Sequence, residues 1–153
     1  MSYIEKNLMS GENILYRSKL HWIVFLWPVL WFAAAIIVFV KGGDTVAVGG
    51  FFILIALITG IASFIGYATS EFGVTNKRVI VKVGFIRRNS LEVLLNKVEG
   101  IQVSQGILGR ILDFGSITVS GTGGTKDPFH KIDAPLEFRK KVQEQIAAVQ
   151  DSR

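Results

Sequence analysis

The side chains that could hold a metal ion or exchange protons are few and scattered along the chain. The two histidines, His21 and His130, lie in different segments, and a metal site would need them to meet and to recruit carboxylates. Several acidic residues are dispersed, with no pair spaced for acid and base roles: Glu71, Glu92, Glu99 and Asp113. The chain has no cysteine, which excludes a thiol nucleophile and a thiolate metal site. We therefore expect no metal, no cofactor and no catalytic site.

A glycine-rich segment from Gly121 to Lys126 superficially resembles a phosphate-binding loop. A Walker loop needs a glycine directly before the lysine, a hydroxyl residue after it and a helix beyond. Here Thr125 precedes Lys126, Asp127 and Pro128 follow it, and the next segment has the pattern of a strand. The segment therefore indicates a hairpin turn rather than a nucleotide site.

Five basic residues follow one another without an intervening acidic residue: Lys77, Arg78, Lys82, Arg87 and Arg88. Each would gain about 1 kcal/mol from an anionic leaflet if it lay within a Debye length of the surface. We expect them to contact lipid headgroups or a partner protein, and the alternative is a solvated basic face that only fixes topology. The net charge of +5 would also suit nucleic acid. A single aromatic residue, Phe85, stands among the basic ones, which is too few for a stacking surface, so we expect no nucleic-acid partner.

Two long apolar runs organise the rest of the chain. Trp22 to Val40 and Val46 to Tyr67 carry no charged residue, and each reaches roughly the 30 Å of a bilayer's hydrocarbon core. Gly42 and Gly43 in the short connection supply turn chemistry, which predicts two transmembrane helices that return as an antiparallel hairpin. The alternatives are a buried helix pair in a soluble protein and a secretory signal peptide. The small remainder of the chain disfavours the first, and the second apolar run disfavours the second.

Aromatic and small residues suggest how this hairpin is anchored and packed. Trp22 and Tyr67 stand at its outer ends and are predicted interface anchors. Trp27 and Trp31 share one helical face, and Pro28 between them predicts a kink. We expect this face to pack against the second helix or lipid, with a ligand or partner groove as the alternative. A stripe of small residues in the second run predicts close packing within the hairpin: Ala56, Gly60 and Ser63.

Basic residues near the outer ends of the hairpin set its orientation. Arg17 and Lys19 precede it and the basic stretch that begins at Lys77 follows it, whereas the connection carries one Lys41 beside Asp44. The positive-inside rule then places both termini in the cytoplasm. The sequence therefore divides into an N-terminal segment, 1–21, a transmembrane hairpin, 22–67, and a cytoplasmic domain, 68–153.

Alternating patterns predict strands on both sides of the hairpin. Ile14 to His21 alternates with a period of two, which indicates a strand, and a basic interfacial helix is the alternative. After the hairpin about six short alternating runs follow. Turns are expected between them at 75–77, 96–100 and 121–124, and a helical or irregular link at 106–113.

The last segment has the pattern of an amphipathic helix. Asp133 is its predicted cap, Pro135 stands in its first turn, and one face is apolar: Phe138, Val142, Ile146 and Val149. One such helix after several strands can close the open end of a small barrel. The expected fold class is therefore an α+β membrane protein.

A set of turn glycines, basic pairs and strand residues together resembles a known family. The set comprises Gly11-Glu12, Thr75 to Ile80, Gly84, Arg87-Arg88, Val98 with Ile101, Gln105, Leu108 to Leu112, Gly115, Ile117 to Val119 and Gly121 to Gly124. It is similar to the second bacterial pleckstrin-homology (PH) group and, over nearly the whole chain, to its membrane-anchored, YdbS-like members. These motifs specify a fold better than an activity.

This resemblance implies a split barrel of about seven strands closed by the C-terminal helix. Ile14 to His21 would be the first strand, and the hairpin would be an insertion between the first two strands. Eukaryotic PH domains bind phosphoinositides largely through the loop after the first strand, which here would be the hairpin. Phosphoinositide recognition therefore does not carry over.

The leading interpretation is a non-enzymatic protein of the bacterial cytoplasmic membrane. Its PH-like domain would mediate protein or anionic-lipid interactions, as an oligomer or as a subunit of a complex. The alternative is a small membrane enzyme or transporter accessory subunit acting on a lipid or hydrophobic substrate, with Trp27, Pro28 and Trp31 shaping the site. Neither apolar run contains an ionisable residue, which disfavours this alternative.

Overall fold

The computed structural model describes residues 3–84, 89–125 and 128–151. The chain divides into two compact units. One, the PH-like unit, combines Met1–His21 with Thr69–Arg153, and the other, the hairpin unit, is Trp22–Ala68. Segments on both sides of the hairpin thus belong to one fold.

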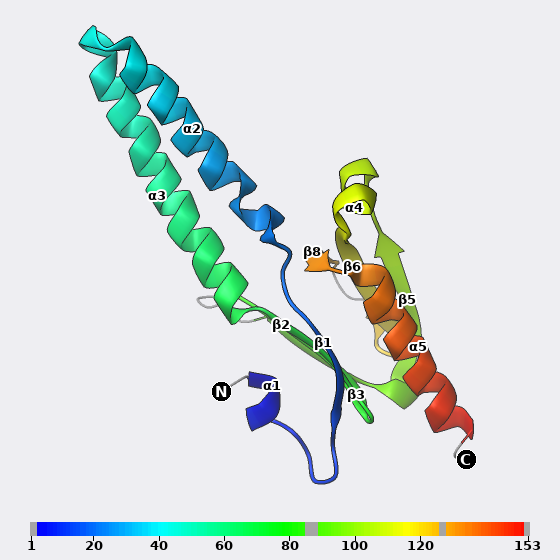
Figure 1. Ribbon diagram of the computed structural model, residues 1–153. Helices are drawn as coiled ribbons and strands as arrows, with labels where there is room; N and C mark the ends of the chain where they lie inside the picture. Colours follow the sequence, from blue (N-terminus) through cyan, green and yellow to red (C-terminus); the bar gives the residue numbers. More distant parts are fainter. Residues whose placement is uncertain (1–2, 85–88, 126–127, 152–153) are drawn as a thin grey trace. The chain divides into compact units, whose positions relative to one another are not determined.

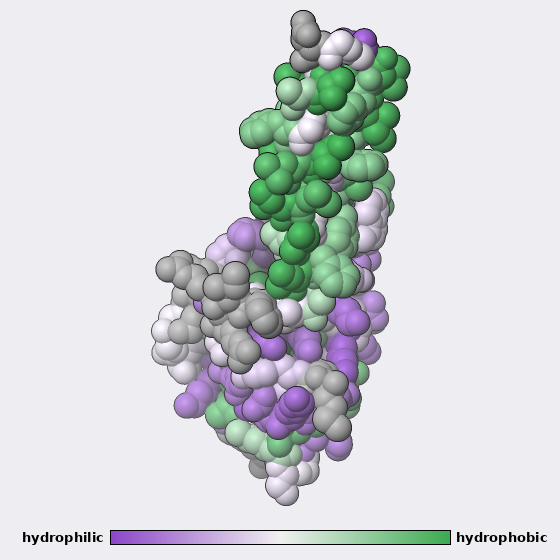
Figure 2. Space-filling view, turned by 90° about the vertical axis from the view of Figure 1, so that its left-hand side faces the viewer, coloured by the Kyte–Doolittle hydropathy of each residue, from purple (hydrophilic) through white to green (hydrophobic). Residues whose placement is uncertain are grey.

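The hairpin unit consists of two long apolar helices. A 3-10 turn, η1 (Trp22–Phe25), leads into α2 (Leu26–Lys41), and a second one, η2 (Gly43–Thr45), leads into α3 (Val46–Thr69). Both helical segments are long and apolar enough to cross a membrane, and apolar residues cover them in Figure 2. Pro28 lies in the first turn of α2, where its missing N–H breaks no helical hydrogen bond. The sequence predicted a kink at Pro28. The structure instead shows a change from the 3-10 turn η1 to the α-helix α2 shortly before Pro28, with no kink inside a continuous helix.

The first sheet of the PH-like unit confirms the strand expected before the hairpin. Its antiparallel order is β1 (Ile14–Ser18), β2 (Glu71–Thr75), β3 (Arg78–Val83) and β4 (Asn89–Leu94). Tyr16 pairs with Val74 and Ser18 with Phe72, so β1 and β2 are neighbours although the hairpin separates them in sequence. The alternative of an interfacial helix at this segment is therefore excluded.

The second sheet contains β5 (Val98–Ser104), β6 (Phe114–Gly121), β7 (Gly124–Thr125) and β8 (Phe129–Asp133). β6 pairs with β5 on one side and with β7 and β8 on the other. The described residues thus form eight strands rather than seven, because the expected turn at 121–124 extends into the two-residue β7. The prediction of a turn at 96–100 is wrong in part. It is a 3-10 turn, η3 (Leu95–Lys97), and β5 starts at Val98 with an irregularity before Gly100.

The helix α5 (Pro135–Asp151) lies alongside β5 and β6 (Figure 1) and closes the core. Phe138 and Val142 are fully buried against both sheets, in a cluster with Phe72, Val74, Val79, Val81, Leu95, Ile117, Val119 and Ile132. Asp133 is not the helix cap, because it belongs to β8. Ala134, with φ of 45°, turns the chain, and its carbonyl accepts the first helical hydrogen bond, from the Phe138 N–H at 3.1 Å.

The residues between β1 and the hairpin join the two sheets. Leu20 forms a β-bridge with Ile132. The His21 N–H donates to the Lys131 carbonyl at 2.7 Å, and the Asp133 N–H donates to the Lys19 carbonyl at 3.0 Å. On the opposite side, β4 pairs only with β3 in the described part of the chain. In the described residues the barrel is thus closed where residues 19–21 meet residues 131–133, and it is open between β4 and β7.

Candidate functional site

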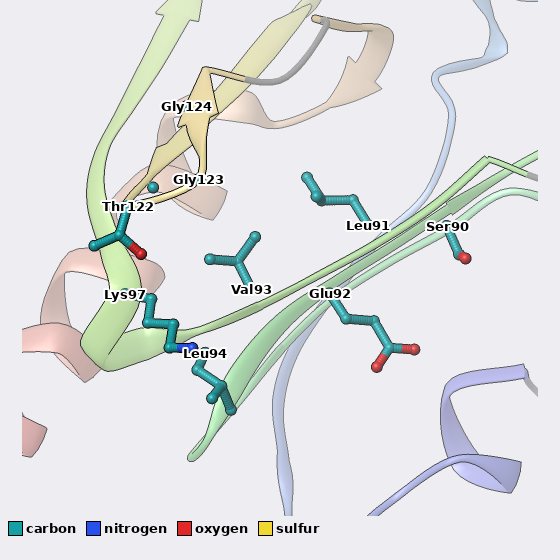
Figure 3. Close-up of a pocket in the computed structure, with 10 residues that line it drawn as sticks. Ser90, Leu91, Glu92, Val93, Leu94, Lys97, Thr122, Gly123 and Gly124 are labelled. Atoms are coloured by element: carbon teal, nitrogen blue, oxygen red, sulfur yellow. The ribbon is translucent and has the colours of Figure 1, made fainter.

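A cavity of about 440 Å³ lies at the open side of the barrel. One wall is β4, from Ser90 to Leu94, and the other is the turn between β6 and β7, Gly121 to Gly124, with Lys97 at one end (Figure 3). The Thr122 N–H donates to the Lys97 carbonyl at 3.1 Å and fixes the turn beside the corner between the two sheets. We call this cavity with its two walls the open seam.

Side chains of β4 alternate between the open seam and the opposite face. Figure 3 shows Leu91 and Val93 directed from β4 toward Gly123 and Gly124, whereas Glu92 and Leu94 leave the other side of the strand. Leu91 and Val93 are half-buried. An edge strand with apolar side chains facing a cavity can accept an extended peptide, which adds main-chain hydrogen bonds and places alternate side chains in the cavity. The sequence analysis missed this site, because only the meeting of two distant segments creates it.

The opposite face of the first sheet holds a buried ion pair between Arg78 and Glu12. The side chain of Glu12 is 0% exposed and that of Arg78 is 6% exposed. Nε of Arg78 lies 2.9 Å from Oε1 of Glu12, and its Nη2 lies 3.0 Å from Oε2. Arg78 also pairs with Glu92 and donates to the Asn7 carbonyl, and the Thr75 hydroxyl donates to Glu12 at 2.8 Å. Arg78 is therefore held within the unit by these contacts, whereas the sequence analysis expected it to contact a lipid headgroup or a partner protein.

The network determines the charge states of both partners. Burial disfavours the charged carboxylate of Glu12, but the donors from Arg78, the Met9 N–H and Thr75 together outweigh burial and lower its pKa. The hydrogen bond to Glu12 raises the pKa of Arg78, with a further contribution from Glu92. Both groups are therefore charged at neutral pH. The pair ties the segment before β1 to β2, β3 and β4.

The other predicted basic residues are not all on one surface. Lys77 is exposed, and its Nζ donates to the Ser10 carbonyl at 2.6 Å. Nζ of Lys82 lies 4.4 Å above the ring of Tyr3, a cation–π contact. Arg87 and Arg88 lie outside the described residues. In the described part of the chain, Lys77 and Lys82 thus remain as candidates for contact with an anion.

The predicted small-residue stripe of α3 faces the first helical segment. Ala56 is 7% exposed, a Cβ on Gly60 would lie 3.7 Å from that of Pro28, and the Ser63 hydroxyl donates to the Val24 carbonyl at 3.0 Å. Close approach of the two backbones therefore depends on small side chains here.

The two tryptophans of the predicted face have different surroundings: Trp31 packs against the second helix, and Trp27 is exposed. The Trp31 ring lies 5.6 Å from that of Phe52 on α3, whereas Trp27 is 60% exposed. At the outer end of the unit, Tyr67 contacts Phe25 at 5.5 Å and Trp22 is 56% exposed. Trp27 and Trp31 therefore do not line one shared pocket.

Among the described residues, one serine and one histidine form a hydrogen-bonded pair. The part of the chain that the structure describes contains no group of three or more histidine and acidic side chains that could hold a metal. Ser116 on β6 and His130 on β8 lie 2.8 Å apart, from Oγ to Nδ1, a pair that the sequence analysis did not foresee. The pair is exposed, and in the described part of the chain no carboxylate orients the imidazole. Cross-strand hydrogen bonding explains the contact.

Comparison with known proteins gives one match. A family model described as bacterial PH domain matches residues 20–147, a range that includes the hairpin. No curated protein and no solved structure matches the chain. The matched range covers the hairpin, β2 to β8 and most of α5, and it begins after β1.

Proposed function

The chain belongs to the bacterial PH domain family, and on that premise we propose that it is a non-enzymatic, membrane-anchored interaction module of the YdbS-like type. In this proposal the hairpin spans the bacterial inner membrane and the PH-like unit binds its partner at the cytoplasmic face. The observation that carries the proposal is the pairing of β1 with β2 across an apolar hairpin. The fold itself thus connects the interaction unit to the membrane segment.

The orientation rests on basic residues that the PH-like unit contributes near the hairpin. Arg17 and Lys19 come shortly before it and Lys77 and Lys82 shortly after it, whereas the connection between the helices carries Lys41 beside Asp44. Both flanks belong to the same unit, which supports placing both termini on the same side of the membrane. The positive-inside rule makes that side cytoplasmic.

The open seam favours a protein segment as the ligand. It offers the edge of β4, two apolar side chains and the small residues of the β6–β7 turn, which suit an extended peptide better than a phosphate group. An anionic lipid is the second candidate and would use Lys77 and Lys82. A role as an enzyme or as a transporter accessory subunit gains little support, because Trp27 and Trp31 do not share a pocket.

Single-cysteine variants test the topology, because the chain has no natural cysteine. We expect Gly43→Cys, in the connection between the helices, to react with an impermeant maleimide added to intact cells. Gln150→Cys, exposed near the end of α5, should react only after the membrane is permeabilised. The reverse pattern would place the PH-like unit outside the cytoplasm and contradict the proposal.

A large side chain placed in the cavity tests whether the open seam binds a peptide. A Cβ on Gly123 would have no atom within 4 Å, so we expect Gly123→Trp to occupy the cavity without disturbing the fold. A photo-crosslinker at Lys97, which is exposed and lines the cavity, should capture a polypeptide in intact membranes. Gly123→Trp should reduce that capture at least about tenfold, the effect of losing about 1.4 kcal/mol of binding.

Gly100→Trp is the matched control, because Gly100 also has open space around it and lies on β5 away from the seam. It should leave capture unchanged. Capture of lipid alone at Lys97, or equal capture by Gly123→Trp and the parent chain, would show that the seam does not bind a peptide. Unfolding temperatures of both variants should match that of the parent chain.

A further inference from the structure

Helix α4 (Ile107–Leu112) exposes three large apolar side chains. Ile107 is 82% exposed, Leu108 63% and Ile111 72%. The helix connects β5 to β6 at one end of the second sheet (Figure 1). Scattered single apolar residues are normal on a surface, but a cluster of this kind on one short helix indicates a contact surface.

The contacts of Gly109 and Gln105 determine which face of α4 is exposed. Gly109 is buried, and a Cβ at this position would overlap the carbonyl oxygen of Phe114. The Gln105 side chain donates to the carbonyls of Gly109 at 3.3 Å and Phe114 at 3.2 Å. Because Gly109 faces inward, Ile107, Leu108 and Ile111 must face outward. The cluster is therefore presented on a rigid support and cannot fold back into the core.

Contacts within the PH-like unit place the end of α4 near His21, the last residue of that unit before the hairpin. Phe114, two residues after α4, stacks on His21 with ring centroids 5.2 Å apart. His21 is held by the Lys131 carbonyl and directly precedes Trp22, the first residue of the hairpin unit. If the hairpin spans the membrane, as in the proposed function, His21 lies at the membrane surface. The contact between the rings of Phe114 and His21 then brings the C-terminal end of α4 close to that surface.

The residues around the cluster suit the boundary between headgroups and acyl chains. Arg110 on α4 and Lys131 on β8 are exposed and basic, and Asp113 and Asp133 are exposed acidic residues near them. Leu136, 47% exposed, lies two residues after Ala134, whose N–H donates to the Asp113 carbonyl at 3.0 Å. Apolar side chains between basic ones are typical of segments that lie in the membrane interface.

We propose that Ile107, Leu108 and Ile111 insert into the leaflet that the hairpin crosses, so that α4 is a second membrane contact of the PH-like unit. This inference rests on the proposed membrane-spanning hairpin. The hairpin alone would anchor the unit but leave it free to rotate about the two connecting strands. A second contact at α4 would hold the unit in one orientation and present the open seam in a fixed direction relative to the membrane.

Spin labels on single-cysteine variants of the full chain measure this directly. The chain would be reconstituted in vesicles of equal parts phosphatidylcholine and phosphatidylglycerol, with labels at Ile107→Cys or Ile111→Cys. Collision with oxygen, which concentrates in lipid, is compared with collision with a water-soluble nickel chelate. We expect the oxygen-to-nickel ratio at both positions to be several-fold higher than at the control Gln143→Cys, an exposed position on α5.

A label at Leu57→Cys, 57% exposed in the middle of α3, separates the two proposals. High oxygen access at Leu57 together with high nickel access at Ile107 and Ile111 overturns the inference and leaves the membrane hairpin intact. Nickel access at Leu57 overturns both. Protection of Ile107 and Ile111 from both reagents means that a second copy covers α4, which also overturns insertion into lipid.

Discussion

Replacing Arg78 by methionine is expected to destabilise the PH-like unit by about 3–5 kcal/mol, the cost of removing one partner of a buried ion pair. The substitution keeps most of the side-chain volume but leaves the Glu12 carboxylate, whose side chain is 0% exposed, without its cation. Glu92 would lose the same partner at less cost, because its side chain is 35% exposed and can be hydrated. Chemical unfolding of the detergent-solubilised chain, with hydrogen exchange of the β2 and β3 amides, measures the loss.

The double variant Arg78→Met with Glu12→Leu should recover most of this loss, since replacing a whole buried pair by apolar residues is often neutral. Equal instability of the single and double variants would show that Arg78 stabilises the unit by packing or through Asn7 and Glu92 instead. Lys77→Met is the matched surface control. Lys77 is exposed, so its loss should change stability by less than about 0.5 kcal/mol.

The penalty for Arg78→Met should depend on pH. The pKa of Glu12 in the folded parent chain lies below its ordinary value of 4.5, so the contribution of Glu12 to stability is present above pH 4.5 and is lost as the pH falls through the lower folded value. In the variant, Glu12 is still buried but has lost the arginine, so we expect the pKa of Glu12 to lie above its ordinary value. Its carboxylate should then take up a proton at a higher pH than in the parent chain. The stability gap between parent and variant should therefore be full at neutral pH. It should begin to narrow as the pH falls through the raised pKa of the variant and go on narrowing as the pH falls through the lowered pKa of the parent chain. A constant gap would contradict the role assigned to Glu12.

This ion pair shows what the sequence could not predict. Arg78 and Glu12 are 66 residues apart, and Arg78 has the spacing of a solvent-facing residue in an alternating strand. The outer face of β2 and β3 is covered because the segment before β1 folds back over it. Ile4 is 1% exposed and contacts Gly73, where an added Cβ would lie 2.7 Å from its Cδ1. Nothing in the composition of that segment indicates a cover for a sheet.

Other parts of the fold follow from pattern alone. Long uncharged runs predict the two helices, and the alternation from Ile14 onward predicts β1, because each signal comes from neighbouring residues. Position-specific expectations were less reliable. Asp133 has a typical capping side chain, but sheet pairing takes it into β8 and leaves Ala134 to start the helix. The link at 106–113 was expected to be helical or irregular, yet its outward apolar face depends on the packing of Gly109.

The largest effect is expected when β1 is removed from the PH-like unit. A fragment of residues 71–151 keeps seven strands but loses the pairing of Tyr16 with Val74 and Ser18 with Phe72. It also loses the ring contact between Tyr16 and Phe138, 6.2 Å apart, and the bridge that closes the barrel at Ile132. The bare edge of β2 would then be open to pairing with other chains. We expect this fragment to aggregate rather than fold.

Restoring β1 without the hairpin should restore the fold. In the matched chain, residues 3–20 are joined through a short glycine–serine linker to residues 70–151, so that every strand and the Glu12–Arg78 pair are present. We expect a soluble unit with dispersed amide spectra and one cooperative unfolding transition. Tyr16→Asp in that chain would place a charge against the core beside Phe138 and should abolish the transition. A well-folded 71–151 fragment would instead show that β1 is dispensable and that the hairpin is an N-terminal anchor rather than an insertion in the barrel.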